Sequence, residues 1–239
     1  MGGAGGVATI RLNRGPVNAL NTAMLRELLA WIHFLGNEDA VKGILLVSAK
    51  DGVFSAGLDL NEFTNPNKEQ FEKFWSSLQE VWMLMTSFPK VLIAGVNGHS
   101  PAGGCLLAMT ADYRVMMEGP AEKPFLIGLN EVPVEITVPP WLINHFATLV
   151  GPRTAERMLQ LGELIPASRA LAIGLVDEVV ADRAALDAAT SAAMARFLAV
   201  PQDGRRLTKD ASRSSLFRLL SGPEERRHDM EFFSALVRK

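Results

Sequence analysis

A glycine-rich segment is the first place in the chain where residue types and spacing indicate chemistry. Residues 98–104, Gly-His-Ser-Pro-Ala-Gly-Gly, lie between two apolar stretches. A phosphate-binding G-x-x-x-x-G-K-[ST] loop is excluded, because Gly104 and Cys105 stand where lysine and a hydroxyl residue belong. A G-x-S-x-G nucleophile elbow fails at its last position, which is Ala102. Two interpretations remain: an anion hole made of backbone N–H groups, or tight packing of a helix on a strand.

A second segment of small residues favours the anion hole. Residues 54–60, Phe-Ser-Ala-Gly-Leu-Asp-Leu, follow another short apolar run. Two such segments that follow two parallel strands can each give one N–H group to the same carbonyl oxygen. The pair therefore predicts a site that stabilises a developing oxyanion.

The composition excludes several other kinds of chemistry. With 239 residues, 48% of them hydrophobic and 21% charged, the chain is typical of one soluble globular domain. The formal net charge of -2 gives no basic excess for a nucleic acid or an anionic membrane. The single cysteine, Cys105, allows no disulfide within the chain, and the longest apolar runs are far too short to insert in a membrane. We expect no metal site, since the four histidines are scattered and have no ligand spacing: His33, His99, His145 and His228.

Apolar periodicity predicts the elements that position the two glycine segments. Strands are expected at 7–12, 43–48, 91–96 and 113–117, with an extended piece at 175–180. Helices are expected from Asn21 or Thr22, over 68–86, from Cys105, and over 139–149, 155–161, 166–174 and 184–200, followed by amphipathic helices after Pro201. The apolar stripe of 68–86 is predicted to face the core. Strands that alternate with helices predict an α/β architecture with largely parallel strands.

A series of motifs runs along residues 5–200 in a defined order. It comprises Val53–Leu60, the segment 96–105, Asp112–Arg114, Ile127–Glu131, and the segment 155–177. Together these motifs resemble the enoyl-CoA hydratase/isomerase (crotonase) superfamily, and most of all its mitochondrial-type Δ3,Δ2-enoyl-CoA isomerases. The resemblance implies an α/β fold, a crotonase-like spiral of β-β-α repeats with C-terminal helices. Residues 1–190 would form the core, and residues 191–239 a helical region that closes the acyl pocket and contributes to oligomerisation.

The resemblance also implies roles for single residues. The N–H groups of Leu58 and Gly103 would hold the thioester oxygen of an acyl-CoA. Hydratases of this family carry two glutamates, and here one of them is Glu131 while the position of the other is Leu106. Glu131 would therefore act as the only base, with Glu135 either a second acid or, as we favour, a solvent-facing residue. Lys90 would meet a CoA phosphate or remain a solvated lysine. The substrate-binding residues implied in this way are Ala56, Gly57, Leu58, Asp59, Leu60, Lys90, Gly104, Leu106 and Asn130.

The activity implied by the resemblance is a shift of the double bond of 3-enoyl-CoA esters to the trans-2 position, in fatty acid β-oxidation. The alternatives are hydration of 2-enoyl-CoA, another crotonase-type reaction, and a non-catalytic acyl-CoA-binding protein. No cofactor is expected, since coenzyme A is part of the substrate. The resemblance implies a homotrimer or a dimer of trimers, because the family usually assembles in this way. Apolar residues in the C-terminal helices also predict an oligomer: Leu216, Phe217, Leu219, Phe232, Phe233 and Leu236. Bacterial cytoplasm and mitochondrial matrix are both compatible compartments.

Overall fold

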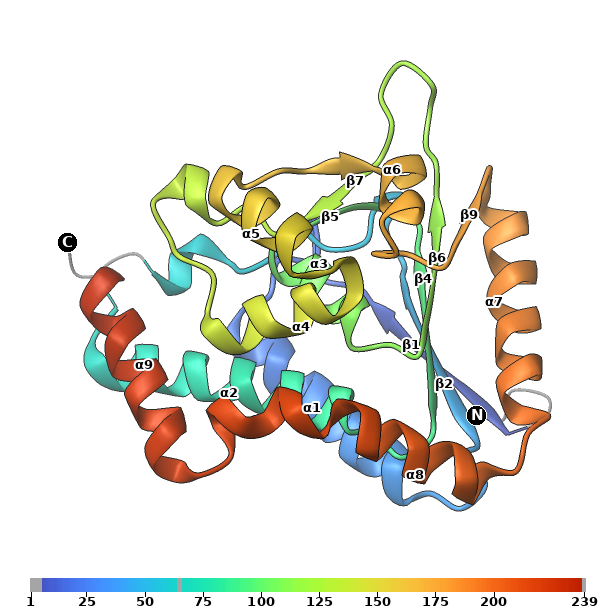
Figure 1. The fold of residues 1–239 in the computed structure, drawn as a ribbon, viewed down its shortest axis with the longest axis horizontal. Helices are drawn as coiled ribbons and strands as arrows, with labels where there is room; N and C mark the ends of the chain where they lie inside the picture. Colours follow the sequence, from blue (N-terminus) through green and yellow to red (C-terminus); the bar gives the residue numbers. More distant parts are fainter. Residues whose placement is uncertain (1–5, 64–65, 238–239) are drawn as a thin grey trace.

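The computed structural model describes residues 6–63 and 66–237, which contain two β-sheets surrounded by helices (Figure 1). The larger sheet has five parallel strands in the order β1-β2-β4-β6-β9. Their bounds are β1 Val7–Leu12, β2 Gly43–Ser48, β4 Val91–Val96, β6 Tyr113–Met117 and β9 Glu178–Val180. β4 is buried along its whole length. Such central strands need apolar residues on both faces, which explains the uninterrupted apolar runs in the sequence.

The smaller sheet has four short strands in the order β3-β5-β7-β8. Their bounds are β3 Gly52–Val53, β5 Gly98–Pro101, β7 Leu126–Gly128 and β8 Ile165–Pro166. β3, β5 and β7 are parallel, and β8 runs antiparallel to β7. Three times in succession, the chain makes one strand in the larger sheet, makes the next in the smaller sheet, and then enters a helix. These β-β-α repeats are the predicted architecture.

Nine α-helices are described, with three 3₁₀ segments between them. The helices are α1 Thr22–Asn37, α2 Lys68–Thr86, α3 Gly103–Met109, α4 Pro140–Val150, α5 Pro152–Leu161, α6 Ala167–Ala172, α7 Arg183–Leu198, α8 Gln202–Arg213 and α9 Pro223–Val237; the 3₁₀ segments are η1 Leu60–Glu62, η2 Val132–Val134 and η3 Ser214–Leu220. Side chains cap the helices where the sequence predicts a start: Asn21 accepts from the N–H of Met24, and Asn67 with Gln70 forms a capping box on α2. The predicted division after residue 190 falls within α7.

The predicted glycine-rich loop at 98–104 is wrong in part. Its first four residues form β5, which pairs with β3 and β7, and α3 begins at Gly103 rather than at Cys105. The strand β7 was not expected at all. Both strands consist of only three or four residues and are held by backbone pairing with segments distant in the sequence, so side-chain periodicity carries no signal for them.

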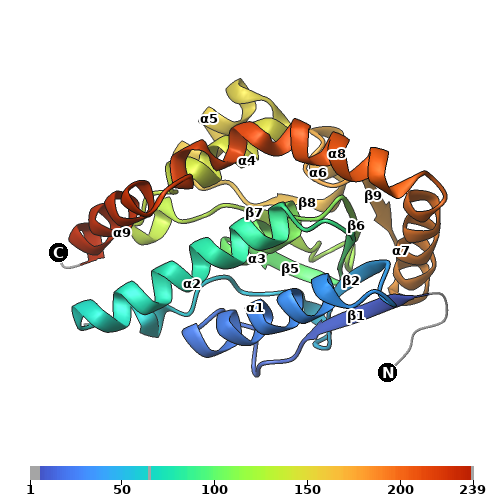
Figure 2. The ribbon, with the colours of Figure 1, turned by 90° about the horizontal axis from the view of Figure 1, so that it is seen from below.

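The core is apolar and its largest side chains come from α2. The predicted stripe faces inward, since each of its members is at most 2% exposed: Phe71, Trp75, Leu78, Val81, Trp82 and Met85. Trp75 stacks on Phe233 of α9 with ring centroids 4.4 Å apart. The carboxylate of Asp229, also on α9, accepts hydrogen bonds from the indoles of Trp75 and Trp141. These contacts fix α9 against α2 and α4. The ribbons of α9 and α2 lie alongside each other in Figures 1 and 2.

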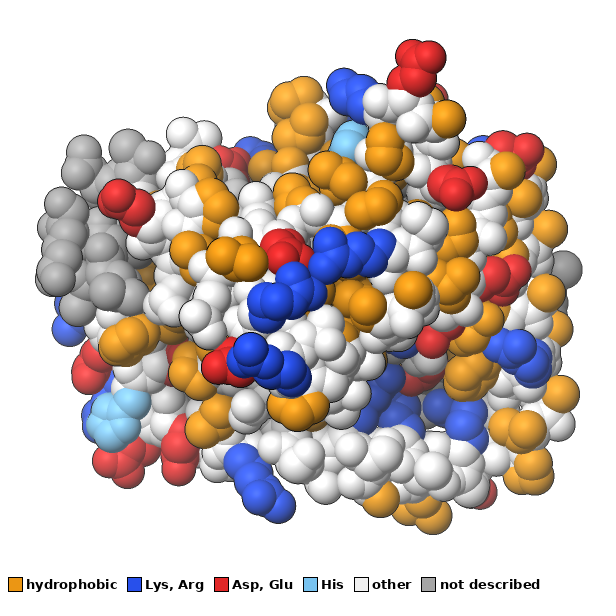
Figure 3. Space-filling model, turned by 45° about the horizontal axis from the view of Figure 1, so that its top comes forward, with side chains coloured by type: hydrophobic (Ala, Val, Ile, Leu, Met, Phe, Trp, Pro, Cys, Tyr) orange, Lys and Arg blue, Asp and Glu red, His pale blue; other side chains and the backbone are white. Residues whose placement is uncertain are grey.

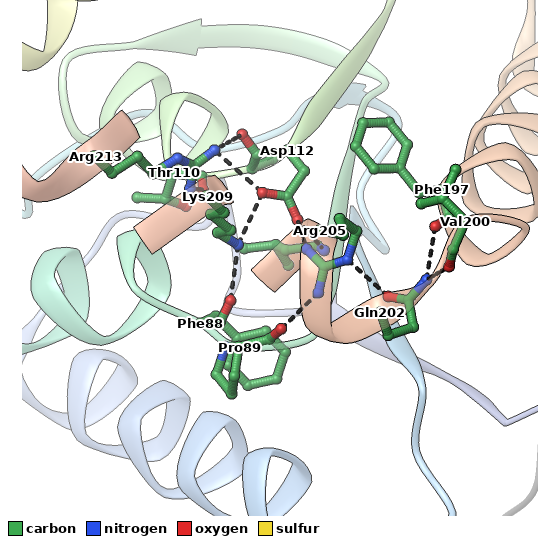
Figure 4. Close-up of polar contacts among 12 residues, drawn as sticks. Phe88, Pro89, Thr110, Asp112, Phe197, Val200, Gln202, Arg205, Lys209 and Arg213 are labelled. Atoms are coloured by element: carbon green, nitrogen blue, oxygen red, sulfur yellow. Dashed lines mark hydrogen bonds and ion pairs between the residues drawn. The ribbon is translucent and has the colours of Figure 1, made fainter. Parts of the chain in front are cut away.

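A buried charge cluster fixes α8 on the core (Figure 4). We call it the Asp112 cluster; it consists of Asp112, Arg205, Lys209 and Arg213. The ammonium of Lys209 lies 2.8 Å from the carboxylate of Asp112 and also donates to the carbonyl of Phe88. Arg213 lies 3.2 Å from the same carboxylate and donates to the carbonyls of residues 86, 110 and 111, just beyond or at the ends of α2 and α3. The cations thus satisfy helix-end carbonyls as well as the buried acid.

The remaining charges are spread over the surface. In Figure 3, lysine and arginine side chains lie beside acidic ones on the face shown, in keeping with the near-zero net charge. Among the described ion pairs, Arg157 and Arg169 both join Glu163. None of the described helices is both long and apolar enough to span a bilayer.

Candidate active site

Three loops meet at one edge of the smaller sheet because they follow three parallel strands. β3 leads into Phe54–Leu58, β5 into Ala102 and Gly103, and β7 into Leu129–Glu131. The strand register pairs Val53 with His99 and Pro101 with Gly128, so the three carboxyl ends lie side by side. In α/β proteins this edge of a parallel sheet is where ligands usually bind.

The first loop presents the N–H group of Leu58. The residue before it, Gly57, has φ +92°, and a Cβ at that position would lie 3.0 Å from the Cβ of Ala102. Glycine is therefore required both by the backbone conformation and by the close approach of the second loop. Within the described residues, the N–H of Leu58 donates to no acceptor.

The second loop presents the N–H group of Gly103 beside it. Ala102 adopts φ +46° and donates its own N–H to the carbonyl of Gly128 at 2.8 Å. With ψ −117°, this sparsely populated positive-φ conformation costs a non-glycine residue about 1–3 kcal/mol, and such strain often accompanies a functional site. Gly103 is the first residue of α3, where an N–H has no partner within the helix, and no described residue accepts from it.

The two free N–H groups are neighbours. A Cβ built on Gly57 would lie 3.1 Å from the nitrogen of Gly103, and one built on Gly103 would lie 3.2 Å from the nitrogen of Leu58. Gly104 lets the loops approach this closely, since a Cβ there would overlap the carbonyl oxygen of Ser55. The predicted juxtaposition of the two glycine segments is thus present in the structure. Two unpaired neighbouring donors are suited to holding one oxygen that gains negative charge.

The third loop contributes Glu131, a buried carboxyl group. Its residue is 8% exposed, and its Oε2 has no hydrogen-bond partner among the described residues. Burial raises the pKa of Glu131 to about 7. Its backbone is held by the N–H groups of Val134 and Ile136, which both donate to its carbonyl. A carboxyl group that titrates near neutral pH and carries an unoccupied oxygen is equipped to act as a general base.

The first turn of α3 borders Glu131. Burial raises the pKa of the Cys105 thiol, and the carboxylate of Glu131 adds to this effect, so the two groups are electrostatic neighbours. The next residue, Leu106, is 1% exposed and part of the apolar core. An apolar residue at this position keeps water from the first turn of α3 and supplies no second carboxylate.

The other predicted binding residues lie along the first loop and beside Glu131. Ala56 and Leu60 are exposed, and Asp59 is nearly buried. Burial alone would raise the pKa of Asp59, but the N–H of Asn61 and the guanidinium of Arg14, 2.8 Å away, hold that pKa below its usual value. Asn130 is partly buried directly before Glu131.

Lys90 does not join this group of residues. Its ammonium donates to the carbonyls of Leu35 and Glu38, at 2.8 and 2.7 Å, and so caps the end of α1. Lys90 precedes β4, whereas the glycine segment follows the other end of that strand. Each residue of a strand adds about 3.3 Å to its length, so the whole of β4 separates Lys90 from the glycine segment. Nearness in sequence to the second loop therefore did not mean nearness in space.

Glu135 and the histidines lie outside the site. Glu135 is exposed and has φ +60° at the end of η2, in agreement with the favoured solvent-facing interpretation.

His145 is buried, its Nδ1 accepts from the indole of Trp82, and burial lowers its pKa to about 3, so it is neutral at physiological pH. His99 accepts from the N–H of Leu126. Among the described residues, no three His, Cys, Asp or Glu side chains are grouped so that they could hold a metal ion.

One segment beside the site was missed at the sequence level. Residues 14–20 run alongside the first loop, where Ala56 donates to the carbonyl of Val17 and Leu20 donates to that of Gly57. Its central residue, Asn18, is completely buried. An asparagine inside a short apolar stretch that leads into a helix is a weak sequence signal for a residue that holds a turn.

Comparison with known proteins agrees with this geometry. Residues 2–239 match the family model described as "Enoyl-CoA hydratase/isomerase". The mitochondrial enoyl-CoA delta isomerase 1 of Rattus norvegicus is 37% identical over 235 residues, covering 98% of this chain and 79% of the relative. The crystal structure of human mitochondrial delta3-delta2-enoyl-CoA isomerase superimposes with a TM-score of 0.93 at 37% identity, covering 98% of this chain and 89% of that one. A crotonyl-CoA hydratase from Syntrophomonas wolfei is 31% identical over 211 residues, which are 88% of this chain and 79% of the relative. The chain belongs to the enoyl-CoA hydratase/isomerase family.

Proposed function

We propose that the protein is a Δ3,Δ2-enoyl-CoA isomerase, which converts 3-enoyl-CoA esters to trans-2-enoyl-CoA in fatty acid β-oxidation. The observation that carries this proposal is the combination at one sheet edge of two unpaired N–H groups and one buried carboxyl group whose pKa is raised to about 7. The similarity to enoyl-CoA delta isomerases over nearly the whole chain supports it.

In this proposal the substrate's thioester oxygen accepts hydrogen bonds from the N–H groups of Leu58 and Gly103. The ionised carboxylate of Glu131 removes a proton from C2, and the electron pair moves into a dienolate whose negative charge lies on the thioester oxygen. The protonated Glu131 then returns the proton to C4, which leaves the double bond between C2 and C3. Each backbone N–H group that donates to the thioester oxygen is worth about 10²–10³-fold in rate, and a positioned general base such as Glu131 about 10²–10⁴-fold.

The pairing of Glu131 with an apolar residue favours isomerisation over hydration. Adding water across a double bond requires a group that orients the water and a group that delivers a proton to C2. Leu106 occupies the position where the family's hydratases carry their other glutamate, and it is buried in the core. A single carboxylate in a dry site can move a proton between two carbons of the same substrate, and no further cofactor is needed for that reaction.

The exposed part of the first loop is proposed to bind the coenzyme A portion. Ala56 and Leu60 lie at the surface on either side of the buried Gly57, so a bound ligand can run from solvent to the two N–H groups. Leu58, Asp59, Gly104 and Asn130 complete the lining. The acyl chain is proposed to extend towards α2 and the C-terminal helices.

The test is an isomerase assay with cis- and trans-3-hexenoyl-CoA, followed by the absorbance of the conjugated product. Hydration of crotonyl-CoA is measured in parallel with the same enzyme preparation. We expect isomerisation to be the faster reaction. Faster hydration would favour the hydratase alternative, and binding of both esters without exchange of α-protons in deuterated water would identify a non-catalytic binding protein.

We further propose a homotrimer or a dimer of trimers. Leu219 and Phe232 are 41% and 54% exposed on the C-terminal helices, whereas Leu216 and Phe233 are buried within the chain. The side chain of Leu236 lies outside the described residues. Exposed apolar side chains of this size support an interface with another subunit. Light scattering at micromolar concentration tests this, and a mass near 26.0 kDa would contradict it.

The compartment proposed is the mitochondrial matrix or the bacterial cytoplasm. The curated isomerase relatives from rat, mouse and human are mitochondrial proteins by name, which supports the first of these. Fractionation of the source cells, with detection of the native protein, decides between the two.

A further inference from the structure

The loop that carries the N–H of Leu58 is held along one side by residues 14–20. Ala56 donates to the carbonyl of Val17 at 2.9 Å, and Asp59 donates to that of Leu20 at 3.0 Å. Leu20 in turn donates to the carbonyl of Gly57 at 2.8 Å. The backbone groups on either side of Leu58 are therefore engaged, while its own N–H is left without an acceptor among the described residues.

Asn18 lies at the centre of this arrangement and is 0% exposed. Its Nδ2 donates to the carbonyl of Phe54 at 2.9 Å and to the Oγ of Ser48 at 2.8 Å. Its Oδ1 accepts from the N–H of Arg14 at 2.8 Å. Both amide hydrogens and the amide oxygen are thus occupied, so the side chain has a single orientation.

The backbone of Asn18 acts on the same loop through a serine. The hydroxyl of Ser55 donates to the carbonyl of Asn18 at 2.8 Å and accepts from the N–H of Gly57 at 3.2 Å. This chain of hydrogen bonds leads from Asn18 to the Ala56–Gly57 peptide, which directly precedes the peptide that carries the N–H of Leu58. The carbonyl of that next peptide, the carbonyl of Gly57, is held by the N–H of Leu20, so both peptides are fixed from the side of residues 14–20.

We propose that Asn18 is a positioning residue for the oxyanion donor Leu58. It fixes Phe54, Ser55 and Gly57 from one side, so that the N–H of Leu58 stays unpaired and next to that of Gly103. This inference rests on the proposed function, in which those two groups hold the thioester oxygen. Asn18 has no contact with the reacting atoms; its effect passes through the loop.

The residue type at position 18 is narrowly determined. Asn18 has φ +53°, a left-handed conformation that asparagine and glycine adopt more readily than other residues. Glycine would keep the backbone conformation but remove all three side-chain hydrogen bonds. Aspartate would keep the shape but turn a second oxygen towards the carbonyl of Phe54, where a donor is needed.

The experiment compares wild type with Asn18→Gly, with Ser55→Ala as a second variant that removes the other route to the loop. The matched control is Asn97→Ala. Asn97 is 2% exposed and donates to the carbonyl of Lys50 at 2.7 Å, so its loss removes a buried amide hydrogen bond without touching residues 54–58. For each protein we would measure kcat with 3-hexenoyl-CoA, the Kd of hexanoyl-CoA, and the thioester C=O stretching frequency of bound trans-2-hexenoyl-CoA.

We expect Asn18→Gly to lower kcat about 100-fold, the loss that follows when one oxyanion donor is removed, while the Kd changes less than about threefold. The bound C=O frequency should return towards its value in free solution, because the carbonyl is less polarised. Ser55→Ala should shift both quantities in the same direction. Asn97→Ala should lower the melting temperature but leave kcat and the C=O frequency near those of wild type.

The inference is overturned if folded Asn18→Gly or Ser55→Ala keeps the wild-type kcat and C=O frequency. It is equally overturned if Asn97→Ala changes both as strongly, because the effect would then be one of general stability. A wild-type enzyme that neither isomerises the substrate nor polarises its carbonyl would contradict the proposed function itself, a result that the wild-type measurement alone reveals.

Discussion

Replacing Glu131 by glutamine should abolish activity and at the same time stabilise the fold, and the structure gives the size of the second effect. The pKa of Glu131 rises from 4.5 to about 7 on folding because the group is buried. The folded state therefore holds this proton more tightly than the unfolded chain does. Its contribution to stability is fully present below pH 4.5 and is lost as the pH rises through 7.

At 1.36 kcal/mol per pKa unit, ionised Glu131 lowers the free energy of unfolding by about 3 kcal/mol at pH 8. Glutamine has nearly the same shape and does not ionise. We therefore expect Glu131→Gln to be more stable than wild type by about 3 kcal/mol at pH 8 and by only about 1 kcal/mol at pH 5. For a chain of this size the gain at pH 8 corresponds to an increase of about 6–12 °C in melting temperature.

The activity of the same variant should fall by at least about 100-fold, the usual contribution of a general base. In wild type, kcat/KM should decrease about tenfold per pH unit below pH 7, since the protonated carboxyl group cannot accept the C2 proton. The measurements are scanning calorimetry at both pH values and the 3-hexenoyl-CoA assay from pH 5 to 9. Glu135→Gln is the matched control, because that carboxyl group is exposed and should show neither effect.

Two results would refute this reasoning. If Glu131→Gln were equally stabilised at pH 5 and pH 8, or not at all, the carboxyl group would not be buried in the way described. If the variant retained its activity while Glu135→Gln lost it, the base would lie four residues further along the chain.

Three other changes test separate parts of the structure. Glu135→Gly should raise the free energy of unfolding by about 1 kcal/mol in urea titrations, because glycine removes the penalty of φ +60°, and it should leave the isomerase rate within about threefold. Asp112→Asn should lower the free energy of unfolding by about 3–5 kcal/mol in the same titrations, since Lys209 and Arg213 would keep buried charges without their carboxylate; a loss under 1 kcal/mol would contradict the role of the cluster. Cys105 should not react with an aromatic disulfide reagent in the native protein, because it is buried and its thiol pKa is raised, whereas denaturant should release one reactive thiol per chain.

The parts of the fold that follow from side-chain pattern are visible in the sequence. The helix α2 has the predicted bounds because an apolar stripe runs its whole length and Asn67 caps its start. The strands β2, up to its last residue Ser48, and β4 contain no polar side chain because both of their faces are covered. In contrast, β5 contains glycine, histidine, serine and proline, and it is a strand only because two distant segments lie beside it.

Some features of the candidate site can likewise be predicted from the sequence, and others cannot. Gly57 and Gly103 stand out in the sequence because small residues mark close approaches of backbone, and the family's motif pattern indicates Glu131. The burial of Glu131 depends on loops that only the folded chain brings together. The contacts of Lys90 with the carbonyls of Leu35 and Glu38 were not visible in the sequence, because they depend on how the end of α1 packs beside the start of β4. Asn18 was missed because the two groups that accept from its side-chain amide, on Ser48 and Phe54, are 30 and 36 residues away.

The order in which the residues of the Asp112 cluster are translated affects the structure that a nascent chain can form. Asp112 is translated about a hundred residues before its three cations, Arg205, Lys209 and Arg213. While the chain emerges from the ribosome, the carbonyls at the ends of α2 and α3 have only water in place of Lys209 and Arg213. A nascent chain that stalls before residue 205 therefore leaves an acidic group and several carbonyls uncovered. The segment 205–213 thus completes a core whose described strands were all translated before it.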